Sequence, residues 1–423
     1  MKKKNGFLTY ENGLLLILGL TFGIVFVDRN ALTNLMPFVV TDLKLNNTQV
    51  GLLGAALSLT WAASGYVVGI LSDKSGKRKP FLIATVVVFS LCSFLSGVAQ
   101  GFAVLIAARF ILGLSEGPIL PISQSLMVGA TSPGRRGVNA GALQAVFPNL
   151  LGNGLAPIVL VLLAQMYGWR SAFYLAGVPG LICAALIWAF VREQTPEERA
   201  RLAAESAVKD TGAPMSSLDL LKIRNIAVCS VISIFMVGWM VMAWVWLPLV
   251  YTKMRGIPAD QMSWLMGVLG FGAVFFAFFV PWLSEKFGRR PIISLFCLVG
   301  MLVPLGALYA PTTDLWIMGA IVVVGWSASG TFALFMATVP SESVSPGYFG
   351  AAMGLIQGLG EVIGGFSSPF LSGWLADQSS LVTPMFLMIG CNIVACVAAL
   401  FLKETAPAVV ARRADGIAVG APA

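Results

Sequence analysis

Two acid–base pairs interrupt apolar stretches of this chain. Asp28 and Arg29 are adjacent in FVDRNALTNL, while Arg109 and Glu116 are seven residues apart in AVLIAARFILGLSEGPILP. Seven residues are about two helical turns, so Arg109 and Glu116 share one helix face. A charge at the centre of a bilayer costs about 2.5–3.5 kcal/mol on insertion scales. Such residues persist when they pair, line water or function, and these four sum to zero charge.

These residue types suit the coupled binding of an anion and a proton. Arginine keeps its proton and binds a carboxylate through two parallel hydrogen bonds. A carboxyl group in a low dielectric takes up a proton when another anion occupies its cationic partner. A carboxylate that competes for Arg29 or Arg109 would therefore leave Asp28 and Glu116 to be protonated. A purely structural double salt bridge would satisfy the same pattern, and we favour the functional interpretation.

The composition indicates the elements that must hold these charges. The chain has 423 residues, of which 57% are hydrophobic and 11% charged, and its mean hydropathy is +0.86. Apolar runs of about 17–25 residues can each cross a bilayer as a helix. We predict an all-α membrane protein with twelve transmembrane helices. They centre on residues 13–40, 48–72, 79–99, 102–128, 139–166, 170–191, 225–251, 261–284, 291–310, 314–339, 349–375 and 381–402.

The basic residues predict how the chain is oriented. Most of the 27 Lys and Arg lie at the termini and in the even-numbered connections. By the positive-inside rule, both termini are cytoplasmic and the protein is a multi-pass protein of the cell's inner membrane. The net charge of +8 therefore reports topology, and we expect no nucleic-acid partner. In this orientation Asp28 lies about 22 Å from the cytoplasmic edge, and Glu116 lies near the midplane, at about 1.5 Å per residue.

Two segments of the first half recur in the second half. GILSDKSGKRKP begins at Gly69 and PWLSEKFGRRP at Pro281, while SPGRRGVNAGALQ begins at Ser132 and SPGYFGAAMGLIQ at Ser345. The two offsets, 212 and 213 residues, agree to within one residue, so the chain is a duplicated six-helix unit. We predict an amino-terminal bundle over 1–191, a cytoplasmic linker over 192–224, a carboxy-terminal bundle over 225–404 and a cytoplasmic tail over 405–423. Such repeats are typical of transporters whose halves move relative to each other.

The repeated loop resembles the signature loop of the major facilitator superfamily, and the resemblance covers residues 10–404. It reads Gly-x-x-x-Asp-x-x-Gly-Lys-Arg-Lys and is degenerate in its second copy, where Pro281 and Glu285 replace Gly and Asp. The resemblance implies two pseudo-symmetric six-helix bundles and a loop aspartate that latches the cytoplasmic side. A residue without a side chain lets helices approach closely, and a helix N-terminus attracts an anion. The implied gating residues are Gly69, Asp73, Gly76, Arg78, Glu285, Gly288 and Arg289.

Asp-Arg in the first span, combined with Arg-x-x-x-Gly-x-x-Glu-Gly in the fourth, resembles the anion:cation symporter family. That family carries sugar acids, phthalate-like acids and other organic carboxylates, usually with protons. The resemblance implies that Arg29 anchors the substrate carboxylate, that Asp28 and Glu116 carry protons and that Arg109 organises them. The tyrosine usual two residues before the aspartate is Phe26 here, which removes a hydroxyl group that a sugar acid could use.

Further polar and aromatic residues are candidates for the substrate site. Gln144 matches a substrate-contact position of that family, and its repeat partner Gln357 serves either the substrate or a helix–helix hydrogen bond. Glu361 is either a third proton site or a polar contact across the cavity. Trp61 and Trp239 are the aromatic candidates. The first half also offers Asn30, Asn34 and Asn149, whereas the seventh span offers Met236, Trp239, Met240, Met242, Trp244 and Trp246.

An apolar, aromatic wall favours an aromatic carboxylate over a sugar acid as the cargo. Aromatic belts at the membrane interface and methionine as core filler are the alternative explanation. The chain has no histidine, which excludes histidine-based nucleophiles, metal sites and proton relays. We expect no enzyme, no metal and no cofactor, and a proton gradient as the driving force. The expected partners are a small organic anion, protons and membrane lipid, with the protein a monomer; an efflux antiporter and a non-transporting sensor are the rival functions.

Overall fold

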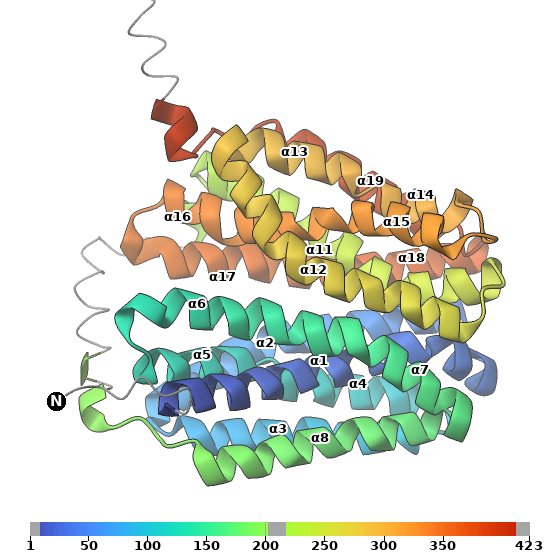
Figure 1. Cartoon of the computed structure of the whole chain (residues 1–423), viewed down its shortest axis with the longest axis horizontal. Coiled ribbons are helices and arrows are strands. Elements are labelled where there is room, and N and C mark those ends of the chain that lie inside the picture. The colour runs from blue at the N-terminus through green and yellow to red at the C-terminus, as the bar shows by residue number, and fades with distance from the viewer. Residues whose placement is uncertain (1–8, 199, 202–216, 412–423) are drawn as a thin grey trace, which may run out of the picture. The chain divides into compact units, whose positions relative to one another are not determined.

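A computed structural model describes residues 9–198, 200–201 and 217–411, and every regular element within them is a helix (Figure 1). Ten helical spans in this part are long and apolar enough to cross a membrane. With α2 (Asn47–Ser75) and the shorter apolar helix α19 (Thr383–Ala399), they are consistent with the twelve predicted spans. The prediction of an all-α, multi-pass membrane protein is therefore confirmed.

The chain divides into two compact units. Unit 1 comprises residues 1–206 and 256–271, and unit 2 comprises residues 207–255 and 272–423. The first part of α12 (Ala259–Phe287) thus groups with unit 1. Parts of the predicted segments lie outside the described residues. They are the basic residues Lys2, Lys3 and Lys4 at the amino terminus, residues 199 and 202–216 of the linker, and residues 412–423 of the tail. The proposed domain boundaries remain predictions.

The further elements of unit 1 are α1 (Tyr10–Leu43), α3 (Arg78–Gly97), α4 (Phe102–Glu116), α5 (Ile119–Ala130), η1 (Pro133–Arg135), α6 (Arg136–Gly141), η2 (Ala142–Val146), η3 (Pro148–Leu155), α7 (Ala156–Tyr167) and α8 (Trp169–Phe190). Within this unit α3 packs against α8 and α4, and α1 packs against η3, α7 and α8 (Figure 1). Apolar side chains such as Leu18, Phe22 and Phe89 fill its core. This packing brings α3 to the charged residues of α1 and α4.

Small residues let α2 and α4 approach closely. A Cβ atom at Gly117, the residue that follows α4, would meet the backbone of Trp61 and Gly65 as well as the side chain of Ser64. Gly113 is likewise closed in by α2, and the Ser64 hydroxyl donates a hydrogen bond of 3.1 Å to its carbonyl oxygen. Close helix approach of this kind is typical of membrane helices with small residues at the interface. It fixes the position of Trp61 relative to the helix that ends at Glu116.

The fifth and eleventh spans contain π-helical segments. In unit 1, η2 and η3 are π-helical and lie between α6 and α7. In unit 2, η8 (Gly360–Gly365) is π-helical and lies between α17 (Phe349–Leu359) and α18 (Phe366–Gln378). π-helical turns inside α-helices occur frequently at functional sites. Here they carry Gln144, Asn149 and Glu361, three of the polar residues that the sequence singled out.

The further elements of unit 2 are α10 (Ser217–Leu220), α11 (Arg224–Leu249), η4 (Val250–Met254), α13 (Arg289–Val299), α14 (Leu302–Tyr309), α15 (Leu315–Trp326), η5 (Ser327–Thr331), η6 (Leu334–Thr338), α16 (Val339–Ser343) and η7 (Pro346–Tyr348). Within this unit α11 is the central helix and packs against α19, η8, α17 and α18. Most of the α11 side chains are buried, including those of Trp239 and Trp246. The aromatic residues of the seventh span therefore lie inside this unit.

Each unit uses a glutamate to cap the helix that follows its signature loop. Glu193 accepts hydrogen bonds from the backbone N–H groups of Arg78 at 3.0 Å and Lys79 at 2.9 Å. Glu404 accepts the equivalent bonds from Arg289 at 2.7 Å and Arg290 at 3.2 Å. The first N–H groups of a helix have no partner within it, and they favour a nearby negative charge. These caps fix the starts of α3 and α13.

Candidate functional site

The four charged residues that the sequence singled out lie in one unit, on α1 and α4. Asp28 is 2% exposed, Arg109 3% and Glu116 0%, whereas Arg29 is half-buried. Their charges interact with one another, since Arg29, Asp28 and Arg109 all act on Glu116. The structure therefore places these four charges in one cluster within unit 1.

Arg29 lies against two aromatic rings. Its guanidinium carbon is 5.6 Å from the ring centroid of Phe26 and 5.4 Å from that of Trp61. A guanidinium group at this distance over a ring face is attracted by the ring quadrupole. Among the described residues, no carboxylate forms an ion pair with Arg29. The ring faces hold the guanidinium group, and its N–H donors can still bind a hydrogen-bond acceptor such as a carboxylate.

Arg109 contacts α1 through the backbone. Its Nη1 donates a hydrogen bond of 3.0 Å to the carbonyl oxygen of Arg29. Arg109 thus joins α4 to α1 at the residue that carries the second arginine. In the part of the chain that the structure describes, neither Asp28 nor Glu116 forms an ion pair with Arg109. The structure does not contain the double salt bridge that the sequence left open.

Asp28 has a partner that the sequence analysis missed. The hydroxyl group of Ser93, on α3, donates a hydrogen bond to Oδ1 of Asp28. The second oxygen, Oδ2, is buried and has no hydrogen-bond partner among the described residues. A serine in an apolar span is common and gives no signal in a single sequence. Only the packing of α3 beside α1 identifies Ser93.

Glu116 is the most isolated acid of the cluster. Both of its carboxyl oxygens are buried and accept no hydrogen bond from any residue that the structure describes. A buried carboxylate without hydrogen bonds is costly, and such a group tends to become neutral. The site therefore holds a carboxyl group whose charge depends on the neighbouring arginines.

A chain of asparagine side chains connects α1 to the fifth span. Asn30 donates from Nδ2 to Oδ1 of Asn153 at 2.5 Å, and Asn153 donates to Oδ1 of Asn149 at 2.7 Å. Asn34 donates to the carbonyl oxygen of Asn30 at 2.9 Å, and its own Oδ1 is buried without a described partner. Asn30, Asn34 and Asn149 were predicted, and the network adds Asn153. Gln144 lies exposed on η2.

The remaining substrate candidates lie in unit 2. Trp239 is buried on α11, where its ring centroid is 5.1 Å from that of Trp326. Glu361 is buried in η8, and Gln357 is half-buried in α17. Their roles in substrate or proton binding remain predictions.

The signature-loop residues are well defined where the structure describes them. Gly76 has φ +64° and Gly288 has φ +102°, conformations that favour glycine. Arg289 bonds Glu342 at 3.0 Å and Ser284 at 2.6 Å, whereas Glu285 is exposed. Arg78 donates to the side chain of Gln194. Gly69 and Asp73 belong to α2, but the surroundings of Gly69 and the side chain of Asp73 lie outside what the structure describes, so the latch remains a prediction.

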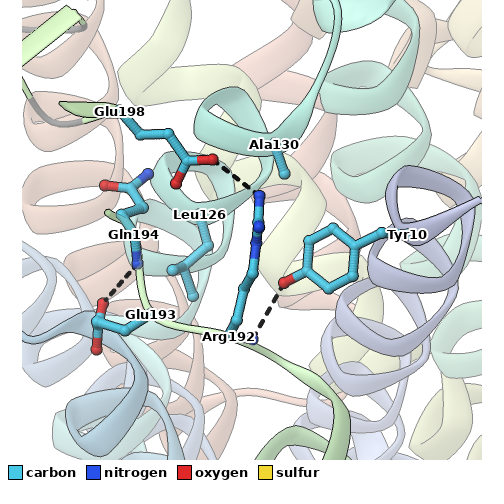
Figure 2. Close-up of a pocket in the computed structure, with 7 residues that line it drawn as sticks. All are labelled: Tyr10, Leu126, Ala130, Arg192, Glu193, Gln194 and Glu198. Atoms are coloured by element: carbon cyan, nitrogen blue, oxygen red, sulfur yellow. Dashed lines mark hydrogen bonds and ion pairs between the residues drawn. The ribbon is translucent and has the colours of Figure 1, made fainter. Parts of the chain in front are cut away.

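A pocket of unit 1 lies away from this cluster, where α1 begins (Figure 2). Arg192 forms an ion pair of 2.8 Å with Glu198, and its guanidinium carbon is 4.8 Å from the ring centroid of Tyr10. The Arg192 backbone N–H donates to the Tyr10 hydroxyl oxygen at 3.1 Å. These groups satisfy one another and attach the start of the linker to α1. The pocket contains none of the predicted site residues, and we assign it a structural role.

Comparisons with known proteins agree with this architecture. A family model described as Major Facilitator Superfamily matches residues 18–369 and 230–419. The chain is 26% identical over 395 residues to the hexuronate transporter of Bacillus subtilis (strain 168), an alignment that covers 89% of this chain and 90% of that protein. It is 30% identical over 348 residues to a probable 4-methylmuconolactone transporter of Cupriavidus pinatubonensis (strain JMP 134 / LMG 1197), covering 80% of this chain and 77% of that protein.

The fold is also similar to that of solved transporters. The match to the crystal structure of the nucleoside transporter NupG covers 91% of this chain and 97% of that one, with a TM-score of 0.73 and 13% sequence identity. The relatives are transporters, which confirms the expectation that the chain is not an enzyme. The expected fold and family are likewise confirmed. This protein belongs to the Major Facilitator Superfamily.

Proposed function

We propose that this transporter takes up an organic carboxylate together with a proton, by secondary active transport and alternating access. The observation that carries the proposal is the state of Arg29. Its guanidinium group is half-buried between Phe26 and Trp61, without a carboxylate partner among the described residues. Asp28 and Glu116 are buried acids of the same cluster. Three of their four carboxyl oxygens have no hydrogen-bond partner among the described residues. One free cation beside two poorly satisfied acids is the arrangement that anion–proton coupling requires.

The cargo carboxylate binds Arg29 in this proposal. A guanidinium group donates two parallel hydrogen bonds to a carboxylate, and ring faces hold it without occupying those donors. The indole N–H of Trp61 is buried and has no acceptor among the described residues, so it supplies a further donor beside Arg29. Trp61 is held in place by the close packing of α2 on α4. Arg29 and Trp61 together anchor the anion.

The proton binds Glu116 or Asp28. When the cargo takes the positive charge of Arg29, Glu116 loses one of the two cations that offset its burial, and Arg109 alone remains beside two acids. An uncompensated buried charge costs roughly several kcal/mol in a low dielectric, and protonation of the acid removes this cost. Asp28 keeps the hydrogen bond from Ser93 and is the second acceptor. Anion and proton therefore enter together.

The class of the cargo follows from the surroundings of Arg29. The hexuronate transporter among the relatives supports an organic anion. The rings of Phe26 and Trp61 flank the anchor and favour an aromatic carboxylate, which can stack on them. A sugar acid is the alternative, and the asparagine chain from Asn30 to Asn149 would offer it hydrogen-bonding groups.

The setting proposed for this activity is the inner membrane, with both termini in the cytoplasm and the protein acting as a monomer among membrane lipids. The proton gradient drives transport, without a cofactor. The positive-inside distribution of Lys and Arg supports this orientation. Gly69, Asp73 and the equivalent loop of the second half would control access on the cytoplasmic side.

Uptake into proteoliposomes tests the proposal. The full chain is reconstituted and supplied with benzoate or glucuronate, with and without an inward proton gradient. We expect the gradient to drive accumulation of one of these acids above its external concentration. Arg29→Ala should lower the affinity about 30-fold or more, since truncating one partner of a hydrogen-bonded charge pair that is buried in the complex costs about 2–5 kcal/mol.

Lys403→Ala is the control. Its side chain is exposed, and its hydrogen bonds with Asn225 come from the backbone, so uptake should stay at the wild-type level. Accumulation that ignores the proton gradient would contradict the coupling. Full affinity in Arg29→Ala would contradict the anchor.

A further inference from the structure

The Gly-Asn-Gly segment of η3, residues 152–154, lies against α1 close to the substrate anchor. A Cβ atom at Gly152 would meet the backbone of Phe26, whose ring holds Arg29. Asn30 donates a hydrogen bond of 3.3 Å to the carbonyl oxygen of Gly152. Phe26 and Asn30 lie within one helical turn of Arg29. A movement of α1 at the anchor would therefore change its contacts with η3.

The same segment also lies against the first part of α12. A Cβ atom at Gly270 would meet the backbone of Asn153 and Gly154. A Cβ atom at Gly267 would meet the carbonyl oxygen of Gly154 and the side chain of Ile158. Small residues allow the backbones of membrane helices to approach this closely. The backbone of η3 is therefore in direct contact with α12.

Asn153 takes part in both contacts. Its backbone carbonyl group is what a Cβ atom at Gly270 would meet, whereas Oδ1 of its side chain accepts a hydrogen bond of 2.5 Å from Asn30 on α1. Its Nδ2 donates to Oδ1 of Asn149 at 2.7 Å, and the residue is only 7% exposed. Breaking a buried hydrogen bond leaves its partners unsatisfied, which costs free energy. The bond between Asn30 and Asn153 therefore keeps α1 and η3 from moving independently.

The helix α12 belongs to both compact units. Residues 256–271 group with unit 1, which contains α1 and η3, whereas residues from 272 onward group with unit 2. The repeated loop PWLSEKFGRRP at its end assigns α12 to the second half of the chain. In transporters that are built from repeats, the halves move relative to each other during alternating access. The contact between η3 and α12 is therefore one that such a movement would make or break.

We propose that Asn153 is a positioning residue that couples the substrate anchor on α1 to the contact between η3 and α12. The proposal rests on the proposed function, because it concerns what binding at Arg29 does to the rest of unit 1. Hydrogen bonds and tightly packed elements carry such coupling when they have two alternative arrangements. Cargo at Arg29 moves α1, the bond between Asn30 and Asn153 transmits this movement to η3, and the contact with α12 is released. Since coupling is reciprocal, this contact also changes the affinity at Arg29.

The reactivity of a cysteine at the contact tests this coupling. Ile158→Cys places a thiol where the side chain packs on Gly267, and its rate of reaction with N-ethylmaleimide is measured in the purified full chain. The reaction of the native cysteines is subtracted with the protein that lacks this change. Without any cargo, Asn30→Ala should raise the rate about fivefold or more, the lower end of typical coupling energies, because α1 no longer holds η3.

The same substitution should add nothing in an Asn153→Ala background, because both changes remove one hydrogen bond. Asn153→Ser, whose hydroxyl group is too short to replace the amide, gives the same comparison if Asn153→Ala does not fold. A rate that stays unchanged in Asn30→Ala, or an effect of Asn30→Ala that persists without the Asn153 side chain, would overturn the coupling.

Thr33→Ala is the matched control on α1. The Thr33 hydroxyl donates to the carbonyl oxygen of Asn30 within its own helix, at 2.9 Å, so its removal should leave the rate unchanged. The control for the label is Leu162→Cys, one helical turn further along α7 and 54% exposed. Its rate should not respond to Asn30→Ala.

Cargo provides the second comparison. Saturating benzoate or glucuronate should raise the rate in the Ile158→Cys protein and leave it unchanged in the Asn153→Ala background, with binding of the acid measured in the same preparations. An acid that binds without raising the rate would contradict the coupling. Failure of both acids to bind would count against the proposed function alone, because the comparison of Asn30→Ala with Asn153→Ala uses no cargo.

Discussion

Arg109 donates a hydrogen bond from Nη1 to the backbone carbonyl oxygen of Arg29, at 3.0 Å. This bond joins two arginines that belong to separate spans. It uses the backbone of Arg29 and does not involve its guanidinium group. The charge of Arg109 is balanced by the nearby acids Asp28 and Glu116 rather than by a direct ion pair. We infer that Arg109 is a positioning residue, which sets the place and orientation of the substrate anchor.

Arg109→Lys tests this role. A lysine keeps the positive charge and loses the planar set of donors, so it cannot reproduce the bond to the Arg29 carbonyl oxygen with the same geometry. We expect the affinity for the transported acid to fall about 10-fold, the effect of about 1.4 kcal/mol, while proton coupling is kept. Uptake is measured over a range of substrate concentrations. Arg224→Lys, at an exposed arginine that also bonds a backbone oxygen, is the control, and an unchanged affinity in Arg109→Lys would exclude the positioning role.

Glu116→Gln should separate binding from coupling. The amide is a neutral isostere of the protonated acid, so the variant should still exchange internal for external cargo. Gradient-driven accumulation should be lost, and the dependence of uptake on external pH should flatten, because the proton no longer binds at this position. Counterflow and net uptake are compared in the same vesicles. Glu197→Gln, at an exposed glutamate, is the control, and accumulation that survives in Glu116→Gln would remove Glu116 from the proton pathway.

Ser93→Ala should move the pH profile of uptake. The Ser93 hydroxyl donates to Asp28, which stabilises the ionised carboxylate relative to the protonated form. Without this bond, which is worth about 1.5–3 kcal/mol to a charged group, Asp28 takes up its proton at higher pH. The midpoint of the profile should therefore rise by about one pH unit or more.

The control for this shift is Ser90→Ala, three residues earlier on α3. The Ser90 hydroxyl is also buried, but it donates to the carbonyl oxygen of Val86 in its own helix, at 2.8 Å. Its removal should leave the midpoint where it is. A midpoint that falls, or stays, in Ser93→Ala would mean that Asp28 does not carry the titrating proton.

Gly117→Ala should destabilise the protein. The added methyl group would meet the backbone of α2 at Trp61 and Gly65, which cannot move aside as a flexible side chain could. Overpacking of this kind costs about 1–3 kcal/mol. Thermal unfolding in detergent should show a lower midpoint. In Gly141→Ala a Cβ atom has nothing within 4 Å, so that variant should unfold at or slightly above the wild-type temperature.

The sequence predicted the transmembrane spans and the charged residues within them well, because hydropathy and residue type can be read directly along the chain. The predicted fourth span, 102–128, corresponds to the helical span Phe102–Ala130, and the fifth, 139–166, to Arg136–Tyr167. Hydropathy cannot show that Arg109 would bond a backbone oxygen instead of a carboxylate, because that depends on the angle between two helices. Nor can it identify Ser93, whose residue type is ordinary in apolar spans.

A third pair of segments repeats between the two halves. VREQTP begins at Val191 and LKETAP at Leu402, and both contain a glutamate after a basic residue and a proline three positions later. Their spacing, 211 residues, nearly equals that of the two repeated segments. The repeat predicts equivalent roles for Glu193 and Glu404, which the structure bears out in the paired caps on α3 and α13.

These caps have a practical consequence for protein engineering. Glu404 lies after α19, close to where a purification tag or a fluorescent fusion would be attached, yet its carboxylate caps the start of a helix 115 positions upstream. Trimming the carboxy terminus to residue 403 would therefore disturb α13 rather than a dispensable end. A fusion junction placed after residue 411 keeps the cap that Glu404 forms on α13.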